Sequence, residues 1–186
     1  MNWQSVALAS VPASPWRNGG GVTRELTVWP AQGEWQWRMS VAEVNASGPF
    51  SVFEGIDRWF AVLEGAGVEL TVMDSNTLHT THTSPFLFDG GATTTCRLIN
   101  GHTRDFNLMV RRGSASSRMV RVAESFVSET FAPKIIAIFA MDTWVNVLFD
   151  DESVRVPPHT LVWTTAEPGQ SIRVQCSQAL FIEIPV

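Results

Sequence analysis

The feature of this sequence that most constrains its fold is a two-residue alternation of side-chain character. Within residues 35–44, the odd positions from 35 to 41 carry large apolar side chains, namely Trp35, Trp37, Met39 and Val41. Successive side chains of a β-strand point to opposite faces of a sheet, so this period predicts a strand. No stretch of the sequence carries an apolar stripe at the helical period of 3.6 residues, and no amphipathic helix is predicted.

Short segments of similar character recur between turn-forming pairs such as Gly90-Gly91 and Pro168-Gly169. The turn Glu64–Gly67 is predicted to join 58–63 and 68–73 as a hairpin. Many short strands at this spacing predict an all-β sandwich or barrel. The remaining strands are expected at residues 22–29, 84–88, 94–99, 106–111, 119–122, 135–140, 144–149, 159–164, 171–175 and 179–184.

The stretch Arg112–Ser117 is small, polar and without periodicity, which is typical of a link between two lobes. It divides the chain into residues 1–112 and 113–186. The second lobe is small for independent folding, so we expect N-terminal strands to complete its sheet and the two lobes to share an apolar interface.

Composition excludes several classes of protein. The 186 residues are 45% hydrophobic with a net charge of −5, which is unlike a disordered chain. The longest apolar run, 135–141, is far shorter than the roughly 20 residues of a membrane helix. Only Arg111 and Arg112 are adjacent cations, so no nucleic-acid partner is predicted. With no secretory signal visible and two distant cysteines, Cys96 and Cys176, a cytoplasmic protein is predicted.

Metal and nucleophilic chemistry find little support in the sequence. His79 and His82 are expected as exposed loop histidines, and His102 and His159 at edge positions. No His-x-His or neighbouring acidic ligand accompanies them. No Gly-x-Ser-x-Gly elbow is present. We therefore predict no catalytic residue, no metal ligand and no cofactor.

The run Asn18–Gly21 precedes a predicted strand and has two interpretations. Consecutive glycines let the backbone turn tightly and approach another group closely, which suits a loop capping the barrel. Alternatively, the run forms the rim of a pocket in which Asn18 donates a hydrogen bond.

Two arginines on predicted strands are a further candidate for a functional site. Arg38 shares a strand face with Ser40, and Arg58 shares one with Phe60. If Phe60 points inward, Arg58 enters the barrel at its mouth, where a guanidinium requires a carboxylate partner. That partner is either a ligand or a side chain of the protein, the candidates being Glu25, Glu43 and Asp105.

Arginines, asparagines and aromatic side chains together have the composition of a small-anion site. Arg38 or Arg58 would clamp a carboxylate, guided by Asn18 and Asn107 and walled by Trp16 or Phe60. The predicted ligand-binding residues are Trp16, Asn18, Glu25, Arg38, Ser40, Arg58, Phe60 and Asn107.

Several motifs in order along residues 1–113 resemble the HutD/Ves family. The N-terminal block is Trp16-Arg-Asn-Gly-Gly-Gly-Val-Thr-Arg-Glu25. Further blocks are Trp37–Ala42, Gly48-Pro-Phe-Ser51, Gly55-Ile-Asp-Arg58, Val62–Gly65, Pro85-Phe86 with Phe88, Arg104–Met109 and Arg111–Gly113.

This resemblance implies a bicupin, in which two antiparallel, jelly-roll-like β-barrel lobes pack together in one chain. It also implies a bacterial cytoplasmic protein linked to histidine utilisation, or a stress-inducible relative. The implied role is non-catalytic regulation through binding of a small carboxylate such as urocanate, formylglutamate or formate.

Two alternatives remain open at this stage. The first is a cupin-type enzyme acting on a small acid, with Glu25, Glu43, Glu64 and Asp105 as candidate acid–base groups. The second is a protein-interaction module without a small ligand, in which the eight tryptophans form a surface patch or a homodimer face.

Overall fold

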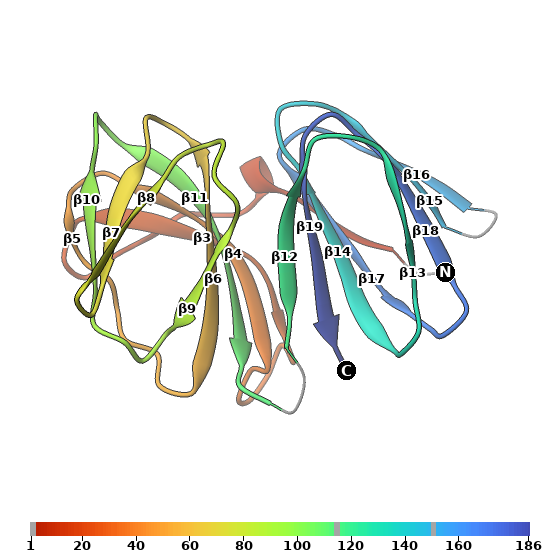
Figure 1. The fold of residues 1–186 in the computed structure, drawn as a ribbon, viewed down its shortest axis with the longest axis horizontal. Helices are drawn as coiled ribbons and strands as arrows, with labels where there is room; N and C mark the ends of the chain where they lie inside the picture. The colour runs from red at the N-terminus through yellow and green to blue at the C-terminus, as the bar shows by residue number, and fades with distance from the viewer. Residues whose placement is uncertain (1–2, 114–115, 150–151) are drawn as a thin grey trace. The chain divides into compact units, whose positions relative to one another are not determined.

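The computed structural model describes residues 3–113, 116–149 and 152–186, and these residues form β-strands with one short 3₁₀ helix, η1 (Leu8–Ser10) (Figure 1). The prediction of an all-β fold is confirmed. Contacts divide the chain into two compact units, Val11–Gly113 and Met1–Ser10 with Ser114–Val186, which we call the cavity unit and the packed unit. Within the described residues, no helix is long and apolar enough to span a membrane.

The cavity unit contains two antiparallel sheets. The six-stranded sheet has the order β2 (Ser14–Pro15), β3 (Gly21–Trp29), β4 (Trp37–Val44), β11 (Thr103–Arg111), β6 (Ile56–Glu64) and β9 (Phe86–Asp89). The four-stranded sheet has the order β5 (Gly48–Pro49), β10 (Thr94–Leu98), β7 (Val68–Val72) and β8 (Ser75–His79).

Strand register stacks the inward side chains of β4, β11 and β6 in layers. Three of these layers lie side by side in the order Ala42–Asp105–Val62, Ser40–Asn107–Phe60 and Arg38–Met109–Arg58. Ala42, Val62 and Phe60 belong to an apolar core that also takes Leu70 and Cys96 from the other sheet. The two-residue period of a strand fixes which side chains share the inward face. Along β4, β11 and β6 that face changes from mainly apolar to mainly polar.

The packed unit is also built from two antiparallel sheets. The larger has the order β1 (Gln4–Ala7), β17 (Thr160–Ala166), β14 (Lys134–Ala140), β19 (Ala179–Pro185) and β12 (Arg118–Val122). The smaller has the order β13 (Phe126–Glu129), β18 (Ser171–Gln175), β15 (Val145–Phe149) and β16 (Glu152–Val156). The N-terminal strand β1 pairs with β17, opposite Leu161 to Trp163 among others.

The hairpin predicted around Glu64–Gly67 is wrong. β6 pairs with β11 and β9, whereas β7 pairs with β10 and β8, so this turn carries the chain from one sheet to the other. Gly65 and Gly67 both have positive φ, at 99° and 115°, which permits so sharp a change of direction. Local sequence encodes the turn, but the pairing partners come from distant segments.

Candidate functional site

The cavity unit holds a cavity of about 420 Å³ against the inward face of its six-stranded sheet. Its floor comes from β4, β6 and β11, and its walls come from the segments that flank β2, β3 and β5. It is lined by Trp16, Arg17, Asn18, Thr23, Arg38, Ser40, Ala42, Pro49, Phe50, Ser51, Phe53, Arg58, Asn107 and Met109.

Arg58 is the most buried charge in this lining, with 7% of its surface exposed. Its Nε and Nη2 donate to Oδ1 of Asn107 at 3.1 and 2.8 Å, and its guanidinium lies 4.6 Å from the ring centre of Phe50. No carboxylate within the described residues forms an ion pair with it. Burial lowers the pKa of Arg58 to about 10, as does the Arg38 cation, so Arg58 remains charged near neutral pH.

Arg38 is the second cation of the cavity and has weaker partners. Its Nη2 lies 3.2 Å from the sulfur of Met109, and its Nη1 lies 3.7 Å from the half-exposed carboxylate of Glu25. Its Nε is buried and has no hydrogen-bond partner among the described residues. Burial lowers the pKa of Arg38, and the charge of Glu25 partly opposes that shift.

The glycine run forms a tight loop at the rim of the cavity. Gly19 has φ of +72°, and the amide of Gly20 donates to the side-chain oxygen of Asn18. Trp16 packs over Gly21, and its indole nitrogen donates to Thr23 at 2.7 Å. The loop is tight, and its Trp16, Arg17 and Asn18 side chains line the cavity. Donation of a hydrogen bond by Asn18 to a ligand stays a prediction.

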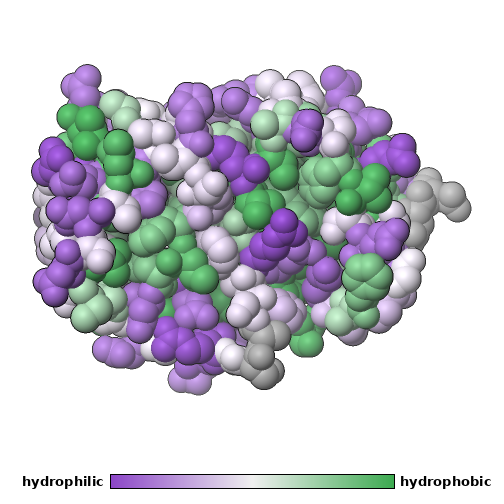
Figure 2. Space-filling model, in the orientation of Figure 1, coloured by the Kyte–Doolittle hydropathy of each residue, from purple (hydrophilic) through white to green (hydrophobic). Residues whose placement is uncertain are grey.

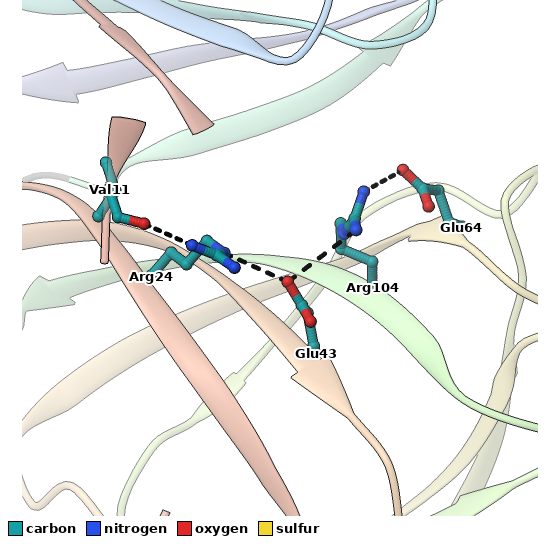
Figure 3. Close-up of polar contacts among 5 residues, drawn as sticks. All are labelled: Val11, Arg24, Glu43, Glu64 and Arg104. Atoms are coloured by element: carbon teal, nitrogen blue, oxygen red, sulfur yellow. Dashed lines mark hydrogen bonds and ion pairs between the residues drawn. The ribbon is translucent and has the colours of Figure 1, made fainter. Parts of the chain in front are cut away.

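The charge of the cavity contrasts with that of a second arginine cluster in the same unit. In that cluster Arg24 and Arg104 both approach Glu43, at 3.2 and 3.9 Å, and Arg104 also pairs with Glu64 at 2.6 Å (Figure 3). The second cluster is self-neutralised. The described lining of the cavity contains three arginines and no acidic residue.

The three carboxylates considered as partners of Arg58 have different surroundings. Glu43 is engaged by Arg24 and Arg104, and Glu25 lies beside Arg38. Asp105 is fully buried, one layer deeper than Asn107, with Oδ2 accepting from Thr103 at 2.8 Å. Its Oδ1 is buried with no partner among the described residues. Burial raises the pKa of Asp105 to about 7, although the Thr103 hydroxyl and the Arg58 charge both oppose the rise.

Six of the eight predicted ligand-binding residues line this cavity. They are Trp16, Asn18, Arg38, Ser40, Arg58 and Asn107. Phe60 belongs to the apolar core beside Phe50, and Glu25 touches the site only through Arg38. The sequence reasoning missed Arg17, Phe50 and Phe53 among others, although the motif Gly48-Pro-Phe-Ser51 marks one wall of the cavity.

His79 corrects the expectation of an exposed loop histidine. It ends β8 with 5% exposure, shares a hydrogen bond with Thr77 at 2.8 Å and packs against Phe86 at 4.7 Å between ring centres. Burial lowers its pKa. Burial also raises the pKa of Cys96 to about 12, so its thiol stays protonated near neutral pH. Both side chains pack within the core.

The surface of the cavity unit mixes apolar and polar side chains. Figure 2 shows hydrophobic atoms among hydrophilic ones over β7, β8 and β9, where Leu78 and Leu87 are exposed. Isolated exposed leucines of this kind are ordinary for a folded protein.

Two-sheet units with a polar cavity against one sheet define a cupin-like, all-β protein. A cupin 2 conserved barrel domain protein from Leptotrichia buccalis shares this fold, with a TM-score of 0.59 over 98% of this chain and 96% of that chain at 6% identity. The HutD family model matches residues 8–182, and the chain belongs to the HutD family. The family predicted from the motifs is confirmed.

Relatives and a solved structure agree with this assignment. The chain is 39% identical over 100 residues to an uncharacterized 21.2 kDa protein in the hutC 3′ region of Pseudomonas putida, covering 53% of each. It is 35% identical over 119 residues to protein Ves of Citrobacter koseri, covering 63% of this chain and 62% of that protein. The matches thus span between about half and two thirds of these relatives. HutD from Pseudomonas fluorescens (formate condition) gives a TM-score of 0.84 at 29% identity, covering 99% and 98% of the two chains.

Proposed function

We propose that this protein is a non-catalytic regulator of histidine utilisation that binds a small carboxylate in the cavity of Val11–Gly113. The observation that supports the proposal is the charge of the lining, which has Arg17, Arg38 and Arg58 but, among the residues that the structure describes, no acidic side chain. An arginine enclosed by apolar walls is stabilised by an anion that it can bind through paired hydrogen bonds. Urocanate, formylglutamate and formate are the ligands we propose.

The geometry of Arg58 suits this role. Asn107 occupies its Nε and Nη2 and holds the guanidinium plane in place, while Phe50 lies against its face. Its Nη1 has no hydrogen-bond partner among the described residues. A donor fixed in position before binding loses little conformational entropy when the ligand arrives.

The remaining walls set the size and shape of the ligand. A volume of about 420 Å³ falls within the range of small-molecule pockets, roughly 300–1,000 Å³. Trp16, Phe50 and Phe53 supply flat apolar surfaces, and Ser40 and Asn18 supply polar groups. Such a lining favours a small planar anion over a large apolar compound.

The proposed link to histidine utilisation rests on the names of relatives. One relative is named for its position beside hutC, and a structural relative is named HutD, which supports a role in histidine utilisation. We further propose a bicupin of two barrels, a cytoplasmic location and a homodimer. We propose neither nucleic acid nor membrane as a partner.

Isothermal titration with formate, formylglutamate and urocanate tests the binding. We expect Arg58→Met to weaken binding of whichever ligand binds by about 30-fold or more, since a buried charged hydrogen bond is lost. The matched control is Arg97→Met, because Arg97 is 60% exposed and pairs with Glu69 on the surface of the same unit. Failure of all three ligands to bind the folded protein, or equal binding by the Arg58 variant, contradicts the proposal.

The non-catalytic part needs its own measurement. Each ligand is incubated with the purified protein and followed by proton NMR, and we expect its spectrum to stay unchanged. Turnover that stops in Asp105→Asn or Glu25→Gln would instead establish the enzyme alternative.

A further inference from the structure

The carboxyl of Asp105 is buried one layer below the cavity and has few hydrogen-bond partners. It is 0% exposed, and of its two oxygens only Oδ2 has a described hydrogen-bond partner, the hydroxyl of Thr103. An ionised carboxylate needs several donors when it is buried, because it gives up its hydration. Burial with so few donors therefore costs the ionised carboxylate more than the neutral carboxyl.

This carboxyl is connected to the cavity through Asn107. The two residues alternate on the inward face of β11, and Nδ2 of Asn107 donates to the backbone carbonyl of Asp105 at 3.3 Å. Oδ1 of the same Asn107 accepts both hydrogen bonds from Arg58. Asp105 and Arg58 also attract one another electrostatically, because the charge of each favours the ionised form of the other.

Few other titratable groups face Asp105. Its neighbours across the sheet are Ala42 on β4 and Val62 on β6, both apolar. From the opposite sheet, Cys96 on β10 interacts with it and stays neutral because burial raises its pKa to about 12. Arg38 on β4 acts on Arg58 and therefore only indirectly on Asp105.

We propose that anion binding in the cavity is coupled to protonation of Asp105, which serves as a positioning residue that acts through Arg58. This inference rests on the proposed function. When Asp105 is ionised, its charge offsets that of Arg58 and repels the incoming anion. When Asp105 is protonated, the whole charge of Arg58 is available to the ligand.

The direction of the pH dependence follows from linkage. A bound anion raises the pKa of Asp105 above its value in the free protein, so binding takes up a proton. Affinity is then constant at pH values below the free-protein pKa, which burial places at about 7, and falls as the pH rises above it. The cavity would thereby bind its anion more tightly in mildly acidic conditions.

Titration calorimetry with formate between pH 6 and pH 8.5 tests the coupling, because formate itself does not titrate in this range. We expect binding about five- to tenfold weaker at pH 8.5 than at pH 6. Titration at pH 7.5 in two buffers of different ionisation enthalpy should show uptake of a fraction of a proton for each formate bound.

Asp105→Asn should bind formate with less than twofold variation over the same range. Glu69→Gln removes an exposed carboxyl from the same unit and should keep the wild-type pH profile. If the Asp105 variant does not fold, the proton uptake of the wild-type protein decides the matter alone. Formate binding that is equally strong at both pH values, without proton uptake, overturns the coupling and leaves the proposed function standing. Absence of formate binding at every pH, with no binding of the other ligands, overturns both.

Discussion

The two units use the same two-sheet architecture but fill their interiors differently. In the packed unit, β14 is the central strand of the larger sheet and directs Ile136, Ile138 and Ala140 into an apolar core. In the cavity unit, the corresponding inward positions of the central strand β11 are Asp105, Asn107 and Met109. Within the described residues, every buried charged, amide or imidazole side chain belongs to the cavity unit, whereas the packed unit buries only hydroxyls among its polar groups.

The comparison shows which residues separate a two-sheet unit with an apolar core from one with a polar cavity. Replacing apolar side chains at a few inward positions leaves the hydrogen-bonded strands intact, because the backbone ladder does not depend on them. It does prevent the sheets from filling the space between them, since polar groups must keep partners or a cavity. The packed unit also has a hollow, of about 590 Å³ beside β12 and β13, but its lining includes the acidic Glu124. Within the described residues, only the cavity unit has a buried charged side chain in the lining of its cavity.

The largest effect on stability is expected from the packed interior. Ile138 is fully buried in the core of the packed unit, so Ile138→Ala should lower the free energy of unfolding by about 2–5 kcal/mol, measured by urea denaturation. Formate affinity of the folded variant should not change. Ile138→Val, which leaves a smaller void, should lose only about 0.5–1.5 kcal/mol. A change in formate affinity would break the division of roles between the units.

A smaller effect, with a particular pH dependence, is expected from the buried acid of the cavity unit. Because burial raises the pKa of Asp105 to about 7, its folded form retains a proton that the unfolded chain releases near pH 4. That stabilising contribution is complete below pH 4 and is lost as the pH rises to 7.

Asp105→Asn removes this titration. The stability of the variant relative to wild type should therefore increase by about 2–3 kcal/mol between pH 5 and pH 8 in urea denaturation. Glu69→Gln, at an exposed position, serves as the control for a general effect of lost charge. A stability difference that stays constant with pH would show that Asp105 is ionised throughout.

The smallest of the three effects concerns the rim of the cavity. A methyl group on Gly21 would collide with the backbone carbonyl of Glu43 and press on the ring of Trp16. Gly21→Ala should lower the free energy of unfolding by about 1–3 kcal/mol and weaken formate binding, because the indole wall must move. Gly48→Ala is the matched control, since a methyl group there meets no atom within 4 Å. If both variants lose equal stability and formate affinity, the close contact of Gly21 with the Glu43 carbonyl and the Trp16 ring does not contribute to either property.

Much of the local structure was predictable from the sequence. The alternation over residues 35–44 placed β4 correctly and assigned Arg38 and Ser40 to the same face. Short or polar strands such as β8 and β13 escaped detection, because their sequences lack a clear alternation. The buried state of His79 escaped for the same reason. The predicted pairing of 58–63 with 68–73 failed because a turn specifies a change of direction and not the partner strand.

The sequence by itself determined the all-β class, the family and the set of arginines that lie on strands, since these depend on period, motif and residue type. The tertiary structure alone decided which face of each strand points inward and which charges meet. Glu43 pairs with Arg24 and Arg104, whereas Arg58 bonds to Asn107 and forms no ion pair with a carboxylate in the described part of the chain. Those outcomes depend on the register between strands that are distant in the chain, and a two-residue period contains no information about that register.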